Sequence, residues 1–352
     1  MSILTTTIGA YPKPDYLHLP DWFTVPDGPD TANPTAAWAD AMAAMGDEAV
    51  VILDRATHEV VRAQVDAGID VPTDGEVRRE NYIHYHCRHL HGFDFEQLTE
   101  KSLRNGAYSA FLPTVRAAIS VRDKFLLADW KVAQAATDRA VKITLPGPMT
   151  VTDTVADAYY NDPQRFGAAL ADALNVEVRA LADAGCAHIQ IDEPLFARNP
   201  ERALAFGLDN LERAFHGCPR SVTRTVHMCC GYPDKLDSDD YPKADPSAYL
   251  ALADAVDYAR IDAVSIEDAH RHNDLSLLER FSKTTVILGV IAVARSNVET
   301  VEEVQGRLVS ALQHIDAERL MAAPDCGLGL LGADLANAKL QVLCTAARRV
   351  PG

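Results

Sequence analysis

Short apolar segments rich in β-branched residues alternate along the chain with longer segments in which apolar residues recur every three or four positions. The short segments predict eight strands, at residues 5–12, 68–76, 140–148, 187–194, 224–231, 262–268, 285–293 and 318–327. The longer segments, such as 166–185 and 298–315, predict amphipathic helices between most of the strands. Strands separated by helices pair in parallel, because a parallel neighbour is reached only through a crossover. The pattern therefore predicts a single (β/α)8 TIM barrel, an α/β fold, over residues 1–352.

An open, doubly wound parallel sheet is the alternative architecture for this pattern. It is disfavoured because no glycine-rich phosphate-binding loop follows the first predicted strand. Two connections, at about 77–139 and 232–260, are longer than a simple helix. Loops at the C-terminal face of a barrel carry its chemistry, so both insertions are predicted to be extended βα loops and candidate lids.

The composition disfavours some classes of partner and indicates the compartment of the protein. The chain has 352 residues, of which 48% are hydrophobic, and a formal net charge of −17. This acidic balance disfavours nucleic acid and anionic membrane surfaces, because both are negatively charged. The first residues lack the basic and apolar regions of a signal peptide, and no apolar run approaches the roughly 20 residues of a membrane helix. The seven scattered cysteines, an odd number, indicate reduced thiols and a cytoplasmic protein.

Polar residues gather at the C-terminal ends of the predicted strands, where the catalytic residues of a barrel lie. They are Asp74, Glu76, Asp192, Glu193, His227, Cys229, Cys230, Glu267, Asp268, Asp325 and Cys326. All are expected to converge on one rim. Asp192 and Glu193 could form a structural salt bridge or cap, but a carboxylate pair at a barrel mouth more often has a functional role.

The segment "VHMCCG" at residues 226–231 predicts half of a metal site. Successive side chains of a strand point to opposite faces, so His227 and Cys229 share the inward face and Cys230 points away. Together with Glu267 and Cys326 at two later strand ends, they suit Zn2+, which accepts imidazole, thiolate and carboxylate ligands. The alternative is that these cysteines are small buried apolar residues.

A second group of candidate ligands lies in the first insertion, at His84, His86, His89 and His91. Their spacing does not clearly place three imidazoles on one helical face. Packing and surface roles are therefore predicted for them in place of a second metal site.

Seven motifs, in order along the chain, carry a family resemblance: "TTTIGAYP", "DGEVRRENYIHYHCRHLHGFDF", "LPGPMT", "IQIDEP", "VHMCCG", "SIED" and "PDCGLG". They cover nearly the whole chain, and it resembles the catalytic C-terminal barrel of cobalamin-independent methionine synthase. Full-length members of that family carry an additional N-terminal barrel, so this chain looks like the short, core form.

The resemblance implies a zinc-dependent methyltransferase. It implies that Zn2+ is held by His227, Cys229, Glu267 and Cys326, and that homocysteine binds zinc through its sulfur. It also implies that the homocysteine ammonium meets Asp192 and Glu76, and that its carboxylate meets the backbone around Ile8, Gly9 and Ala10. The physical chemistry agrees, because two carboxylates favour a cation and backbone N–H groups near a glycine favour an anion. The implied reaction is transfer of a methyl group from methyltetrahydrofolate or a methylcorrinoid to the thiolate, which forms methionine.

The chain departs from the family pattern on the side of the methyl donor. The family serine of the first strand is Ala10, and the family histidine thought to help protonate the leaving group is Ala294. The aspartate two residues earlier is Ala292, and the tryptophan that stacks on the pterin is about Thr154. The catalytic acid is thus unknown, with Arg295 and His270 available, and a partner protein that delivers the methyl donor is an open expectation.

Three alternatives remain open. A zinc alkyltransferase acting on another thiol, such as coenzyme M with an epoxide, is disfavoured because a sulfonate thiol has no ammonium for Asp192 and Glu76. A zinc-storage or structural protein would not need those carboxylates. A decarboxylase-type barrel would not need two thiolates.

Overall fold

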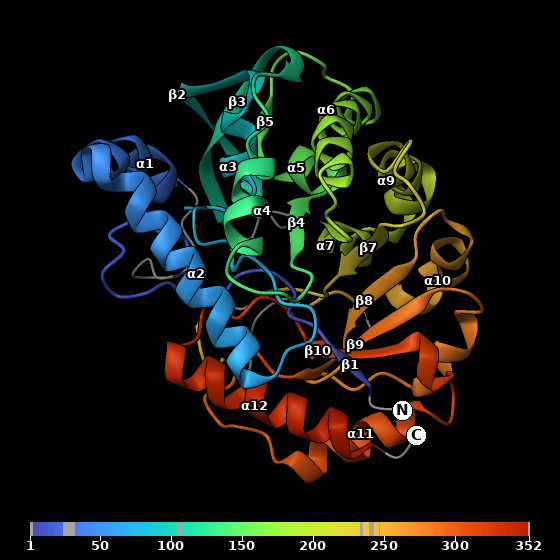
Figure 1. Ribbon diagram of the computed structural model, residues 1–352. Helices are drawn as coiled ribbons and strands as arrows, with labels where there is room; N and C mark the ends of the chain where they lie inside the picture. The colour runs from blue at the N-terminus through green and yellow to red at the C-terminus, as the bar shows by residue number, and fades with distance from the viewer. Residues whose placement is uncertain are drawn as a thin grey trace.

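The computed structural model describes residues 3–23, 32–103, 108–232, 235–238, 243–245 and 247–350. Its main sheet is a curved parallel sheet with the strand order β1-β10-β9-β8-β7-β6-β4 (Figure 1). These strands are β1 (Leu4–Thr5), β4 (Lys142–Pro146), β6 (His188–Asp192), β7 (Thr223–Met228), β8 (Ala263–Glu267), β9 (Thr285–Ile291) and β10 (Leu320–Pro324). The prediction of a parallel α/β barrel is confirmed. Six of its predicted strands overlap most of a regular strand, whereas the first, predicted at 5–12, overlaps β1 only at Thr5.

The second predicted strand, at 68–76, is reduced to two isolated bridges that link the edge strands of the sheet. Val71 pairs with Thr6, and Thr73 pairs with Lys142, both in parallel. The pairing is short because Pro72 has no N–H to donate and because the Gln64 side chain takes up both backbone groups of Thr73. Gln64 accepts the Thr73 N–H at 3.0 Å and donates to its carbonyl at 3.0 Å.

The outer layer of the barrel is helical, as the alternating pattern predicts (Figure 1). α6 illustrates why these segments are helices, since Asp162 caps its first turn, Pro163 begins it, and residues such as Leu170 and Leu174 are buried along one face. The helices are α1 (Ala32–Met45), α2 (Ala49–Ala67), α3 (His84–Arg88), α4 (Leu126–Gln134), α5 (Pro148–Thr154), α6 (Pro163–Asp183), α7 (Pro194–Arg198), α8 (Pro200–Arg202), α9 (Leu208–Ala214), α10 (Ala248–Tyr258), α11 (Val301–Ala311) and α12 (Ala333–Arg349). Within the described ranges, none of the helices combines the length and the apolar character needed to span a bilayer.

The first insertion is more ordered than the loop predicted at 77–139. It contains α3, α4 and an antiparallel hairpin of β2 (Leu90–Leu103) and β3 (Tyr108–Val121), with β5 (Ala156–Asp157) parallel to β3. The hairpin projects at one end of the molecule beside α6 (Figure 1). Phe93 and Val115 of the hairpin are buried in a second core cluster, which they share with Val151 of α5 and with Phe166 and Leu170 of α6. The second insertion, at 232–260, ends in α10, and parts of its first half lie outside the described residues.

Candidate metal centre and substrate pocket

Three predicted metal ligands meet at the C-terminal ends of β7 and β10. One ligand atom each from His227, Cys229 and Cys326 lies within 4.8 Å of the other two. His227 is on β7, Cys229 directly follows that strand, and Cys326 follows β10 by two positions. Cys230 belongs instead to the core packed between the barrel and its helices, as strand alternation predicts. The arrangement offers one imidazole and two sulfur ligands, which suits a soft or borderline cation.

Hydrogen bonds orient the side chains of this group and shift the pKa values of its two cysteines in opposite directions. The His227 Nδ1 lies 3.0 Å from the Ser265 Oγ, and its Nε2 lies 3.5 Å from the Cys326 Sγ. The hydrogen bond from Cys326, together with His227, lowers the pKa of Cys229 well below its usual value despite burial. The same hydrogen bond, together with burial, raises the pKa of Cys326 well above its usual value. A bound cation would favour the thiolate form of both cysteines.

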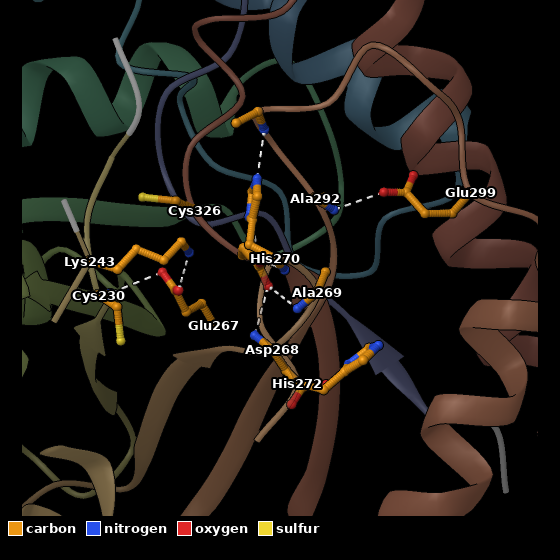
Figure 2. A network of polar contacts seen from close by, with 12 residues as sticks. Cys230, Lys243, Glu267, Asp268, Ala269, His270, His272, Ala292, Glu299 and Cys326 are labelled. Carbon is orange, nitrogen blue, oxygen red and sulfur yellow. Dashed lines mark hydrogen bonds and ion pairs between the residues drawn. The ribbon is translucent and has the colours of Figure 1, made fainter. Parts of the chain in front are cut away.

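Glu267, the fourth predicted ligand, is not part of the group of three. Its carboxylate forms an ion pair with Lys243 and accepts the Cys230 N–H at 2.9 Å (Figure 2). Burial and the nearby Asp325 raise the pKa of Glu267, and Lys243 opposes that shift. No motif or periodicity points to Lys243, which lies in the irregular half of the second insertion.

A pocket brings the metal group together with every predicted substrate-binding residue. Its lining includes Ile8, Gly9, Ala10, Glu76, Asp192, His227, Cys229 and Cys326. Segments far apart in the sequence therefore meet at one mouth, as the barrel prediction requires. The pocket thus combines the carboxylates of Glu76 and Asp192, a stretch of backbone and the sulfur ligands.

Asp192 is buried at the end of β6 and is held by a neighbour on its own strand. The Gln190 amide donates to the Asp192 carboxylate at 2.7 Å and to the Ile8 carbonyl at 2.6 Å. Burial raises the pKa of Asp192 to about 7; His227 opposes this shift and Glu76 adds to it. A buried carboxyl in this state gains from the arrival of a cation.

Glu76 faces Asp192 from an unusual backbone conformation. Its φ of 56° lies in the left-handed region, which a non-glycine residue occupies at an energetic cost, often at functional sites. Thr144 Oγ1 donates to its Oε1 at 2.7 Å, and Arg79 lies 3.1 Å from the same oxygen. Gly9 packs closely here, since a Cβ on it would lie 2.6 Å from Glu76 Oε1. Arg79, to which no sequence pattern pointed, partly neutralises the site.

Glu193, adjacent to Asp192, points into a different environment. Its carboxylate accepts the N–H groups of Met149 and Thr150, each at 2.9 Å, and the Thr150 hydroxyl at 2.8 Å. It therefore fastens the start of α5 to the end of β6. Glu193 thus has the structural, capping role that was the alternative for this carboxylate pair. Asp192, in contrast, lines the pocket.

Two of the positions that depart from the family pattern, Ala292 and Ala294, make hydrogen bonds through their backbone N–H groups. The Ala292 N–H donates to Glu299 Oε1 at 2.9 Å, and the Ala294 N–H donates to His270 Nε2 at 3.0 Å. Thr154 lines the pocket. Four aromatic residues that the sequence analysis did not select also line it, namely Trp22, Phe23, Tyr82 and Tyr232.

Three of the four histidines of the first insertion make local contacts. His84 Nδ1 lies 2.7 Å from the Thr35 hydroxyl, and His86 Nδ1 lies 2.7 Å from the Tyr82 carbonyl. His89 stacks on Phe125 with ring centroids 3.8 Å apart. His84 also lines the pocket, and packing in place of a second metal site stays a prediction for this group.

Comparisons with known proteins point in one direction. Residues 25–232 and 241–349 match the family model described as the catalytic domain of cobalamin-independent synthase. The chain is 28% identical to the methionine synthase of Thermococcus kodakarensis over 342 residues, 96% of this chain and 90% of that protein. It is 28% identical to the methionine synthase of Saccharolobus solfataricus over 339 residues, 96% of this chain and 91% of that protein.

A solved structure is similar over the full length. It is a B12-independent methionine synthase from a Shewanella species in complex with selenomethionine. The two chains superpose with a TM-score of 0.85 and 30% sequence identity, and the match covers 99% of this chain and 97% of the other.

Proposed function

Because the chain belongs to the cobalamin-independent methionine synthase family, we propose that it transfers a methyl group to the sulfur of homocysteine and so forms methionine. The observation that carries this proposal is the shared pocket of the sulfur ligands, Asp192, Glu76 and the backbone at Ile8–Ala10. Each part of homocysteine finds a complementary group there, namely sulfur ligands with a metal, carboxylates and backbone N–H groups. The selenomethionine complex of the Shewanella relative supports the same class of ligand.

Zinc is the proposed cofactor, with His227, Cys229 and Cys326 as ligands. The residues fit zinc because the three ligand atoms are close together and because Ser265 engages the far nitrogen of His227. Glu267 is the proposed fourth ligand when no thiol is bound. Bound zinc would lower the pKa of the homocysteine thiol, so that a thiolate nucleophile exists at neutral pH.

The protein side chains would hold homocysteine in one orientation. Asp192 and Glu76 are proposed to receive its ammonium, and the backbone of Ile8, Gly9 and Ala10 its carboxylate. Burial supports this assignment, because a charge pair inside the pocket is screened less than one in water. Holding both the ammonium and the carboxylate fixes the α-carbon, so that the side chain can direct its sulfur toward the metal group.

The proposed methyl donor is methyltetrahydrofolate or a methylcorrinoid, the latter delivered by a partner protein. The bond between carbon and the homocysteine sulfur forms while the donor's bond to its methyl group breaks, and the electron pair stays with the leaving group. A folate leaving group needs a proton at its nitrogen, whereas a cob(I)alamin anion is stable without one. Alanine at positions 292 and 294, and the engagement of His270 Nε2 by Ala294, favour the donor that needs no acid.

Methionine formation by the zinc-loaded protein tests the proposal. Reactions would contain homocysteine with either methyltetrahydrofolate or methylcobalamin, and Asp192→Asn would serve as the control for the pocket. Methionine formed with either donor, with a raised KM for homocysteine in the variant, supports the proposal. Turnover of coenzyme M with an epoxide, but not of homocysteine, would support the alkyltransferase alternative and contradict this one.

A further inference from the structure

Lys243 brings a positive charge to a carboxylate at the edge of the metal group. Its ammonium forms an ion pair with Glu267, and the two side chains are 15% and 3% exposed. Figure 2 shows the lysine pointing at Glu267, beside Cys230, with Cys326 nearby. Such a short-range pair is nearly shielded from solvent, so its charges interact more strongly than those of a surface pair.

The backbone that carries Lys243 is fastened to the site. The neighbouring Ala244 donates its N–H to the Cys230 carbonyl at 2.8 Å, and its own carbonyl accepts from Arg271 at 2.7 Å. Cys230 in turn donates its N–H to Glu267 at 2.9 Å. The segment 243–245 is thus tied to the residue after Cys229 and to the loop after β8, and the ammonium is held in reach of Glu267.

We propose that Lys243 is a positioning residue that receives the Glu267 carboxylate when the thiol substrate takes its place on the metal. This inference rests on the proposed zinc site. A carboxylate that left the metal without a partner would be a buried, uncompensated charge with Asp325 nearby, which is costly. With Lys243 and the Cys230 N–H in place, Glu267 exchanges one cation for another. The exchange of ligands is thereby made easier in both directions.

The first consequence concerns the metal in the absence of substrate. In the metal-free protein Glu267 is stabilised by Lys243, and this contact must be given up when the carboxylate binds zinc. Lys243→Met is therefore expected to raise zinc affinity by about tenfold, the size typical of changes next to metal ligands. The same variant is expected to weaken homocysteine binding to the zinc-loaded protein by about tenfold, because Glu267 then leaves the metal without a partner.

The experiment measures both affinities, with the metal alone and then with homocysteine. Zinc affinity would be obtained by competition with a chelator, and homocysteine affinity by the change in the visible spectrum of the Co2+-substituted protein. Lys235→Met is the matched control, since Lys235 is an exposed lysine of the same insertion. Lys243→Arg should restore values near those of the wild type.

Removing a positive charge near a cation would raise zinc affinity directly, even if Glu267 played no part. The double variant Lys243→Met, Glu267→Gln distinguishes this direct effect from an effect through Glu267. If Lys243 acts through Glu267, Lys243→Met changes neither affinity in a Glu267→Gln background. Persistence of both changes in that background, or identical behaviour of Lys243→Met and Lys235→Met, would overturn the inference.

Structures of the wild-type protein with zinc test the inference without any variant. Glu267 is expected on the metal without homocysteine and on Lys243 with it. A Glu267 that keeps the same partner in both structures overturns the inference but leaves the proposed function standing. Absence of zinc binding by the wild type would overturn the zinc site and the inference with it.

Discussion

His270 and Asp325 are joined by two hydrogen bonds, from the His270 backbone N–H at 2.8 Å and from its ring Nδ1 at 2.7 Å, both to Asp325 Oδ2. The opposite ring nitrogen accepts the Ala294 N–H at 3.0 Å, which assigns the ring proton to Nδ1. Asp325 Oδ1 also accepts the N–H groups of Asp268 and Ala269. The imidazole thus fastens the ends of β8, β9 and β10 beside Cys326, and the proton-donor role considered for His270 does not fit this geometry.

A structural His270 predicts a loss of stability without a change in the acid–base chemistry of turnover. His270→Ala should lower the free energy of unfolding by about 1–3 kcal/mol, because Asp325 loses a buried donor. The pH dependence of kcat should keep its shape. Thermal unfolding and a pH–rate profile measure the two effects, and His270→Asn, which keeps a donor near Nδ1, should recover part of the stability. Loss of one limb of the pH profile at unchanged stability would instead make His270 the acid.

Removing a sulfur ligand should remove the metal and the activity together. Cys326→Ser is expected to weaken zinc binding by at least about 100-fold, since a thiolate ligand is lost from a group of three. Zinc content after dialysis and methionine formation are the measurements. Cys230→Ala is the matched control, because it deletes the neighbouring thiol and keeps the backbone N–H that Glu267 uses. Tight zinc and full activity in Cys326→Ser would refute the site.

The sequence predicted those parts of the molecule that follow from strand order and side-chain alternation. Once eight parallel units are recognised, residues as distant as Ile8 and Cys326 must reach one rim, and both line the pocket. The alternation predicted for 224–231 likewise separates Cys230, which is in the core, from His227 and Cys229, which line the pocket. These are local rules that hold whatever the loops do.

Contacts made by the insertions could not be predicted in this way. The β2–β3 hairpin breaks its own alternation with register shifts near His91 and after Asp94, so its pattern does not identify strands. The partner of Glu267, Lys243, lies in an irregular segment that no periodicity positions. The second strand of the barrel was predicted too long, because a side chain, Gln64, replaces its backbone partners at Thr73.

Asp257 provides an acid-sensitive contribution to stability away from the site. Burial favours its neutral form, but hydrogen bonds from Ser282, Lys283 and Thr284 outweigh burial and lower its pKa to about 2. A folded-state pKa below the unfolded value near 3.8 stabilises the protein above about pH 4, and this stabilisation is lost as the pH falls toward 2. Asp257→Asn should therefore cost about 1 kcal/mol at pH 7.

Denaturant unfolding of the wild type and Asp257→Asn between pH 7 and pH 2 checks this expectation. The difference between the two proteins should be constant down to about pH 4 and shrink below it. Asp254→Asn on the same helix is the control. Asp254 is exposed, and within the described part of the chain its carboxylate accepts hydrogen bonds from Arg280. A difference that stays constant down to pH 2 would show that the hydrogen bonds of Asp257 do not depend on its charge.

Substitution of the adjacent carboxylates Asp192 and Glu193 should have different effects, one on substrate binding and the other on stability. Asp192→Asn removes a charge that faces the proposed ammonium, so the KM for homocysteine should rise about 30-fold, equivalent to about 2 kcal/mol. Because burial raises the pKa of Asp192 to about 7, the wild-type KM should fall as the pH rises through that value, when the carboxylate becomes charged. This pH dependence should disappear in the variant.

Glu193→Gln is the matched change, since it neutralises the next carboxylate without touching the proposed ammonium site. It should weaken the hydrogen bonds to Met149 and Thr150 and lower the free energy of unfolding, while KM stays near the wild-type value. Steady-state kinetics from pH 6 to 9 and thermal unfolding distinguish the pair. An unchanged KM in Asp192→Asn, or a larger KM effect in Glu193→Gln, would reverse the assignment, because only the carboxylate that contacts the substrate can couple its own ionisation to binding.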